Sequence, residues 1–289
     1  MKWRNRRVSS NIEDKRSSPT RRRRAGKGGI GMIVLALAAM YFGVDPKIIM
    51  SLMGDGGPLS QTSSQADPNY KPSPEQQKLA QFTGVVLADT EDTWHPLFQQ
   101  MGKQYQEPKL VLFTDAVRSA CGHAQAAMGP FYCPGDKKVY IDLGFYQQLK
   151  NRHNSPGDFA QAYVIAHEVG HHVQNLLGTS GKVHQAKQRM SKANGNVLSV
   201  KLELQADCYS GVWAHHTQRA KQVLEQGDIE EALTAASAIG DDRLQKKAQG
   251  YSSPESFTHG TSQQRVKWFT TGFKQGTLES CNTFDAANL

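Results

Sequence analysis

The chain has 289 residues, enough for one or two domains with a substantial apolar core. Its formal net charge of +8 is unevenly distributed, because residues 1–44 contain 11 Lys/Arg and 2 acidic residues, a net charge of +9. The other 23 basic and 24 acidic residues give the remainder a net charge of −1. This near-neutral body argues against a nucleic-acid partner, so a cytoplasmic nucleic-acid-binding protein acting through a basic arm is disfavoured.

The N-terminal part divides into three segments of distinct composition. Residues 1–27 form a basic tail, and the uncharged apolar run 28–44 that follows is at the short end of the length that spans a membrane, although residues 48–50 could extend it. We predict a single transmembrane helix at 28–48, with the preceding arginines holding the N-terminus in the cytoplasm. Residues 49–78 are rich in Gly, Pro, Ser and Gln without apolar periodicity, which predicts a flexible linker.

A cleaved signal peptide is the competing interpretation of the apolar segment, because Ala36-Leu37-Ala38 resembles a cleavage site. That site lies inside the apolar run and the charged region before it is long, so a permanent anchor is preferred. Residues 79–289 would then form one extracytoplasmic domain.

The first half of this domain shows helical and then strand-like patterns. Folding is expected to resume near Leu79 with one or two helices, and Lys109–Phe113 reads as a strand. Phe131–Cys133 and Lys138–Leu143, separated by a Pro-Gly-Asp turn, predict a hairpin. Its second arm is either an edge strand that pairs with an extended peptide or simply a strand of the sheet.

An H-E-x-x-H motif follows in a segment whose apolar spacing is helical, with Asp158 as its expected N-cap and Gly178 as its expected stop. On a helix His167 and His171 lie one turn apart on one face, so both can bind one metal ion, and zinc suits this motif. Glu168 is placed to act as the general base that serves a zinc-activated water. The alternative is an ordinary helix with two surface histidines.

The third metal ligand comes from a later segment. The extended motif H-E-x-x-H-x-x-G-x-x-H fails, because Gln174 and Leu177 stand where it needs glycine and histidine. Glu203 and Asp207 have i, i+4 spacing, so Glu203 is predicted as the third ligand and Asp207 as a hydrogen-bond acceptor for a liganding histidine. An exposed carboxylate pair is disfavoured because like charges repel. Small residues on the same helix would let the two helices approach closely: Ala206, Ser210, Gly211 and Ala214.

The motifs at 167–171 and 203–207, the segment from Cys121 through Gly129-Pro-Phe-Tyr-Cys-Pro134 and the basic anchor together resemble the bacterial neutral zinc metallopeptidases. The resemblance covers nearly the whole chain. It implies an α+β, zincin-like domain of the thermolysin-like (gluzincin-like) type, with the motif helix, a later helix carrying the glutamate ligand and a small antiparallel sheet. It also implies attachment to the bacterial inner membrane, with the catalytic domain outside the cytoplasm.

Four cysteines, Cys121, Cys133, Cys208 and Cys281, all follow the proposed anchor. An even number in an extracytoplasmic domain favours two disulfides, for which three connectivities exist. Cys121–Cys133 is the short-range choice, which leaves Cys208–Cys281. A cysteine metal site is a weak rival, because the chain has no C-x-x-C motif.

The C-terminal part is predicted to contain a helix around Asp228–Lys247 and another that begins near Thr261. His259 precedes the last helix and is predicted either to stabilise the oxyanion of a tetrahedral intermediate or to form a local hydrogen bond. His172, next to the motif, is read as structural.

These residues together predict a membrane-anchored, extracytoplasmic zinc metalloendopeptidase that acts on a peptide or protein substrate. The alternative is a membrane-tethered binding or assembly protein that keeps a zinc site without turnover. An intact Glu168 argues against that alternative, because such a protein has no use for the base.

Overall fold

The structure, a computed structural model, describes residues 1–17, 70–125, 129–146, 149 and 157–285. The predicted anchor at 28–48 lies outside these residues, as does most of the predicted linker at 49–78. Among the helices that the described residues form, none combines the length and the apolar composition needed to cross a bilayer.

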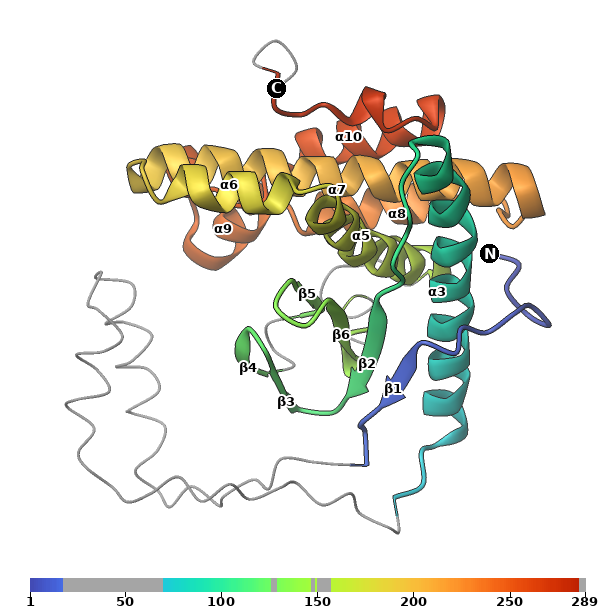
Figure 1. Cartoon of the computed structure of the whole chain (residues 1–289). Helices are drawn as coiled ribbons and strands as arrows, with labels where there is room; N and C mark the ends of the chain where they lie inside the picture. Colours follow the sequence, from blue (N-terminus) through green and yellow to red (C-terminus); the bar gives the residue numbers. More distant parts are fainter. Residues whose placement is uncertain (18–69, 126–128, 147–148, 150–156, 286–289) are drawn as a thin grey trace, which may run out of the picture.

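A four-stranded mixed sheet forms one layer of the domain (Figure 1). Its strands lie in the order β1-β2-β6-β5, with β1–β2 and β2–β6 parallel and β6–β5 antiparallel. Their bounds are Ile12–Asp14 for β1, Lys109–Phe113 for β2, Phe131–Cys133 for β5 and Lys138–Asp142 for β6. A separate antiparallel pair consists of β3 (Ala116–Ser119) and β4 (Gly122–Gln125).

The predicted hairpin is confirmed as β5 and β6, but the predicted antiparallel sheet is a mixed one. Strand β6 is also not an edge, because β2 pairs with it on one side and β5 on the other. The four residues from Val139 to Asp142 are all buried, as a strand covered on both faces requires. The edge on this side of the sheet is therefore β5.

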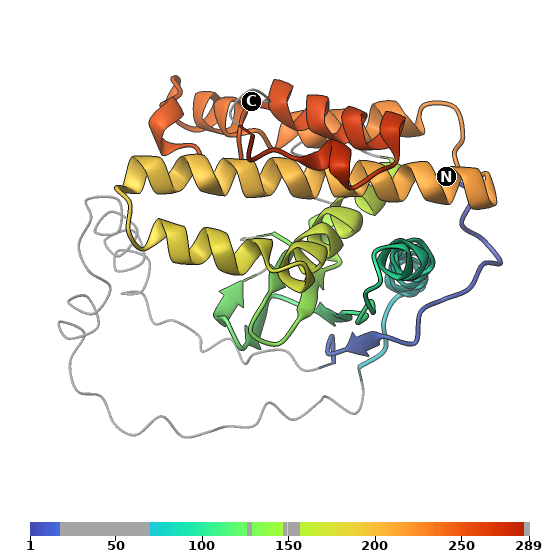
Figure 2. The same cartoon turned by 45° about the horizontal axis from the view of Figure 1, so that its top comes forward.

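Helices cover the sheet and pack on one another in layers. Figures 1 and 2 show α5 between the sheet and α7, with α10 along the far side of α7. The helices are α3 (Pro74–Gln100), α5 (Asp158–Leu176), α6 (Thr179–Lys187), α7 (Lys192–Lys221), α8 (Asp228–Ala238), α9 (Asp241–Gln249) and α10 (Ser262–Gln275). The helix predicted around Asp228–Lys247 is thus two helices. Gly240 separates them at a point where a Cβ would lie 2.4 Å from the backbone nitrogen of Ser262.

Local signals account for several helix boundaries. Ser73 and Gln76 form a reciprocal capping box at the start of α3, inside the segment predicted as linker. Gly178 follows α5 in a left-handed conformation (φ 81°), as a helix stop requires. Asp158 is the first residue of α5, and Gly157 takes the cap position predicted for it.

Residues 1–17, predicted as part of a separate basic tail, instead pack against the domain. Strand β1 pairs with β2, the side chain of Trp3 is buried, and its ring meets Phe82 of α3 edge-on at 5.5 Å between centroids. Arg7 forms ion pairs with Glu91 (2.8 Å) and Asp92 (2.6 Å), both on α3. The arginines here neutralise acids of the domain.

The α-ammonium group of Met1 reaches the start of α5. It lies 2.5 Å from a carboxylate oxygen of Asp158 and 3.2 Å from one of Asp228. These two acids and Glu231 form a cluster with metal-like spacing, but in this structure the cluster faces the ammonium group. The basic segment therefore spans the domain from β2 to the N-terminus of the motif helix.

Both predicted disulfides are present. Cys121–Cys133 joins the turn between β3 and β4 to the end of β5. Cys208–Cys281 joins α7 to the short 3₁₀ helix Glu279–Cys281 near the C-terminus. The second bridge holds the C-terminal segment against the helix that carries Glu203.

Candidate metal centre

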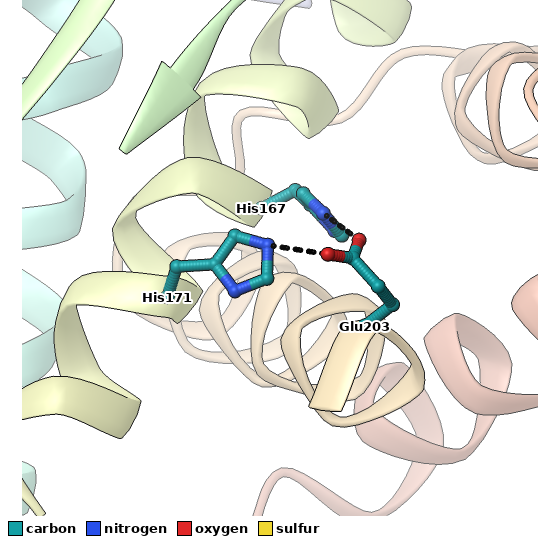
Figure 3. Close-up of side chains that lie close together, drawn as sticks. All are labelled: His167, His171 and Glu203. Atoms are coloured by element: carbon teal, nitrogen blue, oxygen red, sulfur yellow. Dashed lines mark hydrogen bonds and ion pairs between the residues drawn. The ribbon is translucent and has the colours of Figure 1, made fainter. Parts of the chain in front are cut away.

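His167 and His171 of α5 and Glu203 of α7 converge at one point (Figure 3). The Nε2 atom of His167 lies 3.2 Å from one oxygen of Glu203, and Nε2 of His171 lies 3.4 Å from the other. The structure thus brings together the three residues that the sequence predicted as metal ligands.

The close approach of α5 and α7 depends on small residues at their crossing. A Cβ on Gly170 would lie 3.0 Å from the carbonyl oxygen of Ala206, so a side chain there would push the helices apart. Gly211, predicted to serve the same contact, instead faces α10, where a Cβ would lie 2.2 Å from the carbonyl oxygen of Phe269. The small residues of α7 therefore serve two helix contacts.

The Nδ1 atoms of both histidines face hydrogen-bond acceptors. Nδ1 of His167 lies 2.9 Å from Asp207, and Nδ1 of His171 lies 2.9 Å from the amide oxygen of Gln174. The amide nitrogen of Gln174 donates to the carbonyl of Leu202 at 2.7 Å, which leaves its oxygen to face the histidine. Each Nδ1 is thus protonated, and in the neutral form of each imidazole Nε2 carries the lone pair.

This tautomer assignment places two imidazole lone pairs against a carboxylate, so the three groups repel one another unless a cation lies between them. One donor atom from each of the three residues lies within 4.8 Å of the other two, close enough for all three to bind one ion. Two histidines and a glutamate are also a known donor set of catalytic zinc. The residues therefore fit zinc.

The same groups attract a proton, which would compete with a metal ion. Burial disfavours a charged His167, but the charge of Asp207 together with the hydrogen bonds to Asp207 and Glu203 outweighs it and raises the pKa of the imidazole to about 10. Burial likewise opposes ionisation of Glu203, yet the two facing histidines hold the pKa of its carboxyl well below the usual range. Metal binding here is therefore expected to release protons.

Asp207 is buried, and besides His167 two further residues donate to it. Arg265 of α10 donates to both of its oxygens at 2.9 Å, and the hydroxyl of Tyr163 donates at 2.5 Å. The alternative of an exposed carboxylate pair is therefore wrong. Arg265 was missed in the sequence, although it lies one helical turn before the buried Phe269 and so faces the core with it.

The metal centre lies in a cleft of about 580 Å³. Glu168, which is 8% exposed, lines this cleft together with both histidines and Glu203. Much of the remaining lining is apolar: Phe131, Phe145, Val164, Leu202, Ile239 and Leu244. The position of Glu168 beside the histidines is the one predicted for a general base.

His259 also lines the cleft, and its ring is held by a carboxylate that the sequence did not reveal. Nδ1 of His259 lies 3.1 Å from Asp241 at the start of α9. Asp241 in turn accepts backbone N–H bonds from Thr258 (2.7 Å) and Gly260 (3.1 Å), which fixes it in place. The hydrogen bond that this imidazole donates to Asp241 raises the pKa of His259.

Comparisons with known proteins identify the family of the chain. The family described as "Putative neutral zinc metallopeptidase" matches residues 1–284. The chain is 52% identical to the uncharacterized protein YpfJ of Escherichia coli, over 98% of this chain and 99% of that protein. It is 40% identical to an uncharacterized protein of Mycobacterium bovis, over 87% and 86% of the two chains. No solved structure matches the chain significantly. The chain therefore belongs to this neutral zinc metallopeptidase family.

Proposed function

We propose that the chain is a zinc metalloendopeptidase. One observation carries the proposal: two histidines with protonated Nδ1 atoms and a glutamate turn three electron-pair donors toward one point, with Glu168 beside them in an open cleft. A zinc ion held by His167, His171 and Glu203 would activate a water molecule and polarise a peptide carbonyl.

The other residues of the cleft supply proton transfer and charge stabilisation. Glu168 accepts a proton from the attacking water and passes it to the nitrogen of the leaving amine. His259, oriented by Asp241, donates a hydrogen bond to the carbonyl oxygen as negative charge develops on it. Glu168 thus transfers the proton, and His259 stabilises the oxyanion.

The proposed substrate is an extended peptide. Within the described residues β5 pairs with β6 alone, and its residues Phe131 and Tyr132 line the cleft. A peptide could add to the other side of β5 as a further strand. The apolar lining around Val164 and Leu244 favours apolar side chains beside the bond that is cut.

The test is hydrolysis of casein and of internally quenched peptides by zinc-loaded protein. Glu168→Gln should keep stoichiometric zinc and lose about 10²–10⁴-fold in kcat, because the base is gone while the ligands remain. Glu230→Gln, on the exposed face of α8, is the matched control and should change neither quantity. Equal activity of wild type and Glu168→Gln would refute the mechanism. Wild-type protein that binds zinc and cleaves no peptide would favour the binding or assembly alternative.

We also propose that the domain lies outside the cytoplasm and is attached to the membrane through residues 28–48. Two disulfides support an oxidising compartment. The contacts of residues 1–17 do not fit the predicted cytoplasmic N-terminus, because these residues pair with β2 of the same domain. A single span at 28–48 would put residues 1–17 and the domain on opposite sides of the membrane, so we propose attachment without crossing in place of the predicted single span, with residues 1–17 on the same side as the domain.

A further inference from the structure

Strand β5 is attached to the motif helix through one hydroxyl group. The hydroxyl of Tyr132 lies 3.0 Å from Nδ1 of His172 and 3.0 Å from the amide nitrogen of Asn175, both on α5. Its neighbours Phe131 and Cys133 belong to the apolar cluster on the opposite face of the sheet. Tyr132 is therefore the residue of β5 that contacts the helix through hydrogen bonds.

The direction of each hydrogen bond in this set is determined. Nε2 of His172 lies 2.6 Å from the carbonyl oxygen of Gln106, which can only accept, so Nε2 carries the proton. Nδ1 then accepts from the hydroxyl of Tyr132, and the hydroxyl oxygen accepts from Asn175. The ring of His172 is fully buried, and its burial lowers the pKa of the imidazole to about 4. One assignment of protons therefore satisfies all the hydrogen bonds that join Gln106, His172, Tyr132 and Asn175.

The strand is thus held from both faces. On the face away from α5, Cys133 forms its disulfide with Cys121, and Phe131 stacks on Tyr140 of β6 at 4.8 Å between ring centroids. On the face toward α5, Tyr132 is bound to the helix. Among the residues that the structure describes, this three-residue strand pairs with β6 alone and so has few ladder hydrogen bonds of its own. These attachments therefore fix its position.

The helix residues that bind Tyr132 lie close to a metal ligand in sequence. His172 follows His171 directly, and Asn175 lies one turn further on. The position of β5 is therefore set relative to the same rigid turn of helix that places the imidazoles of the metal centre.

We infer that His172 and Asn175 are positioning residues for the substrate: through Tyr132 they hold β5 at a fixed distance from the metal ligands, so that a peptide paired to β5 presents its carbonyl at the metal centre. This inference rests on the proposed function. Small displacements of a bound substrate are costly in rate, and about 1 Å can cost on the order of 10²-fold.

Tyr132→Phe tests the inference because it removes the hydroxyl and keeps the ring. Tyr140→Phe is the matched control, since it removes a hydroxyl from the neighbouring strand that bonds Asp136 at 2.6 Å and does not contact α5. Both variants should retain full zinc. Tyr132→Phe should raise KM for peptides long enough to pair with β5 by about tenfold, with a smaller effect on kcat and little effect on short peptides.

Binding without turnover separates this inference from the proposed function. In the Glu168→Gln background, affinity for a fluorescently labelled decapeptide should fall about tenfold on adding Tyr132→Phe and stay unchanged on adding Tyr140→Phe. Hydrogen exchange of residues 129–134 should accelerate in the first case alone. Asn175→Ala should also weaken peptide binding. Its effect should not add to that of Tyr132→Phe, because both substitutions break the same hydrogen-bond network between β5 and α5.

If Tyr132→Phe changes neither peptide affinity nor the rate of amide hydrogen exchange at residues 129–134, the inference is wrong, whether or not the wild type cleaves peptides. Equal losses for long and short peptides would also overturn it, since they would indicate general damage to the fold. If peptide affinity falls as expected while the wild type cleaves nothing, the inference holds and the proposed function fails.

Discussion

The two metal-site histidines differ in the charge of the group behind them. Asp207, itself paired with Arg265, stands behind His167, whereas the neutral amide of Gln174 stands behind His171. A carboxylate makes an imidazole a stronger electron donor than an amide does. The two ligands are therefore not equivalent, although the motif makes them look so.

Metal affinity should report this difference. Glu203→Ala should abolish stoichiometric zinc binding, because a ligand is lost. Asp207→Asn should weaken zinc binding by about 10–100-fold, since the shape remains but the charge does not. Gln174→Ala should cost less than Asp207→Asn. Titration against a chelating competitor measures all three. If neither Glu203→Ala nor Asp207→Asn lowers zinc affinity measurably, neither residue contributes to metal binding.

The pH dependence of catalysis should depend on Asp241. With Nδ1–H directed at Asp241, His259 can donate from Nε2 only when protonated, so its active form exists below its pKa and is lost as pH rises through it. Asp241 raises that pKa, so Asp241→Asn should move the alkaline limb of the kcat/KM profile to lower pH. A profile that does not move would show that His259 has no part in the reaction.

Spacing within one helix was enough to predict His167, Glu168 and His171, because i, i+4 positions share a face wherever the helix lies. The partners that complete the site could not be found in this way. Arg265 lies 58 residues after Asp207, and the two meet only once α7 and α10 pack together. Asp241 likewise meets His259 across the break between α9 and α10.

At the scale of elements, the site depends on how closely α5 and α7 cross. Gly170→Ala should force the helices apart, destabilise the fold by about 1–3 kcal/mol and weaken zinc binding. Gly181→Ala, in α6, is the matched control: its Cβ would meet no described atom within 4 Å. It should leave zinc binding unchanged and stabilise by up to about 1 kcal/mol, because alanine favours helix. Denaturant unfolding and zinc titration measure both effects. Wild-type affinity in Gly170→Ala would show that the crossing tolerates a methyl group.

The element types could largely be predicted, whereas their neighbours could not. Alternating apolar residues correctly indicated that β6 is a strand, but its parallel partner β2 lies across a long connection that leaves no local signal. The break at Gly240 was missed for the same reason, since it is the approach of Ser262 that demands a residue without a side chain.

For the whole molecule, the main departure from the sequence prediction is the place of residues 1–17. The basic residues before the apolar segment read together as a topological signal, and the arginines 21–24 among them lie outside the described residues, whereas Arg6 and Arg7 pair with acids of α3 about 80 positions later. Composition reports the charge of a segment but not the acids that will face it. Nothing in the sequence of α3 indicates that its acidic residues form ion pairs with arginines near the N-terminus.

Ser10 and Glu230, both exposed, allow the topology to be tested. Single cysteines from Ser10→Cys and Glu230→Cys should respond identically to a membrane-impermeant maleimide on intact spheroplasts, because residues 1–17 and the domain pack together. For an extracytoplasmic domain both should be labelled. Labelling of position 230 alone would support a cytoplasmic N-terminus and contradict the pairing of β1 with β2.

The contact between Met1 and Asp228 also bears on the order in which parts of the domain fold during synthesis. These two residues are 227 positions apart in the chain. At ribosomal rates of about 5–20 residues per second, the later one is synthesised roughly 11–45 s after the first. Arg6 and Arg7 meet their partners on α3 early, because these acids are made well before Asp228, whereas the ammonium group of Met1 lacks Asp228 throughout that interval. The N-terminal segment therefore docks in two stages during synthesis, first on α3 and later, once residue 228 has been made, on the start of α8.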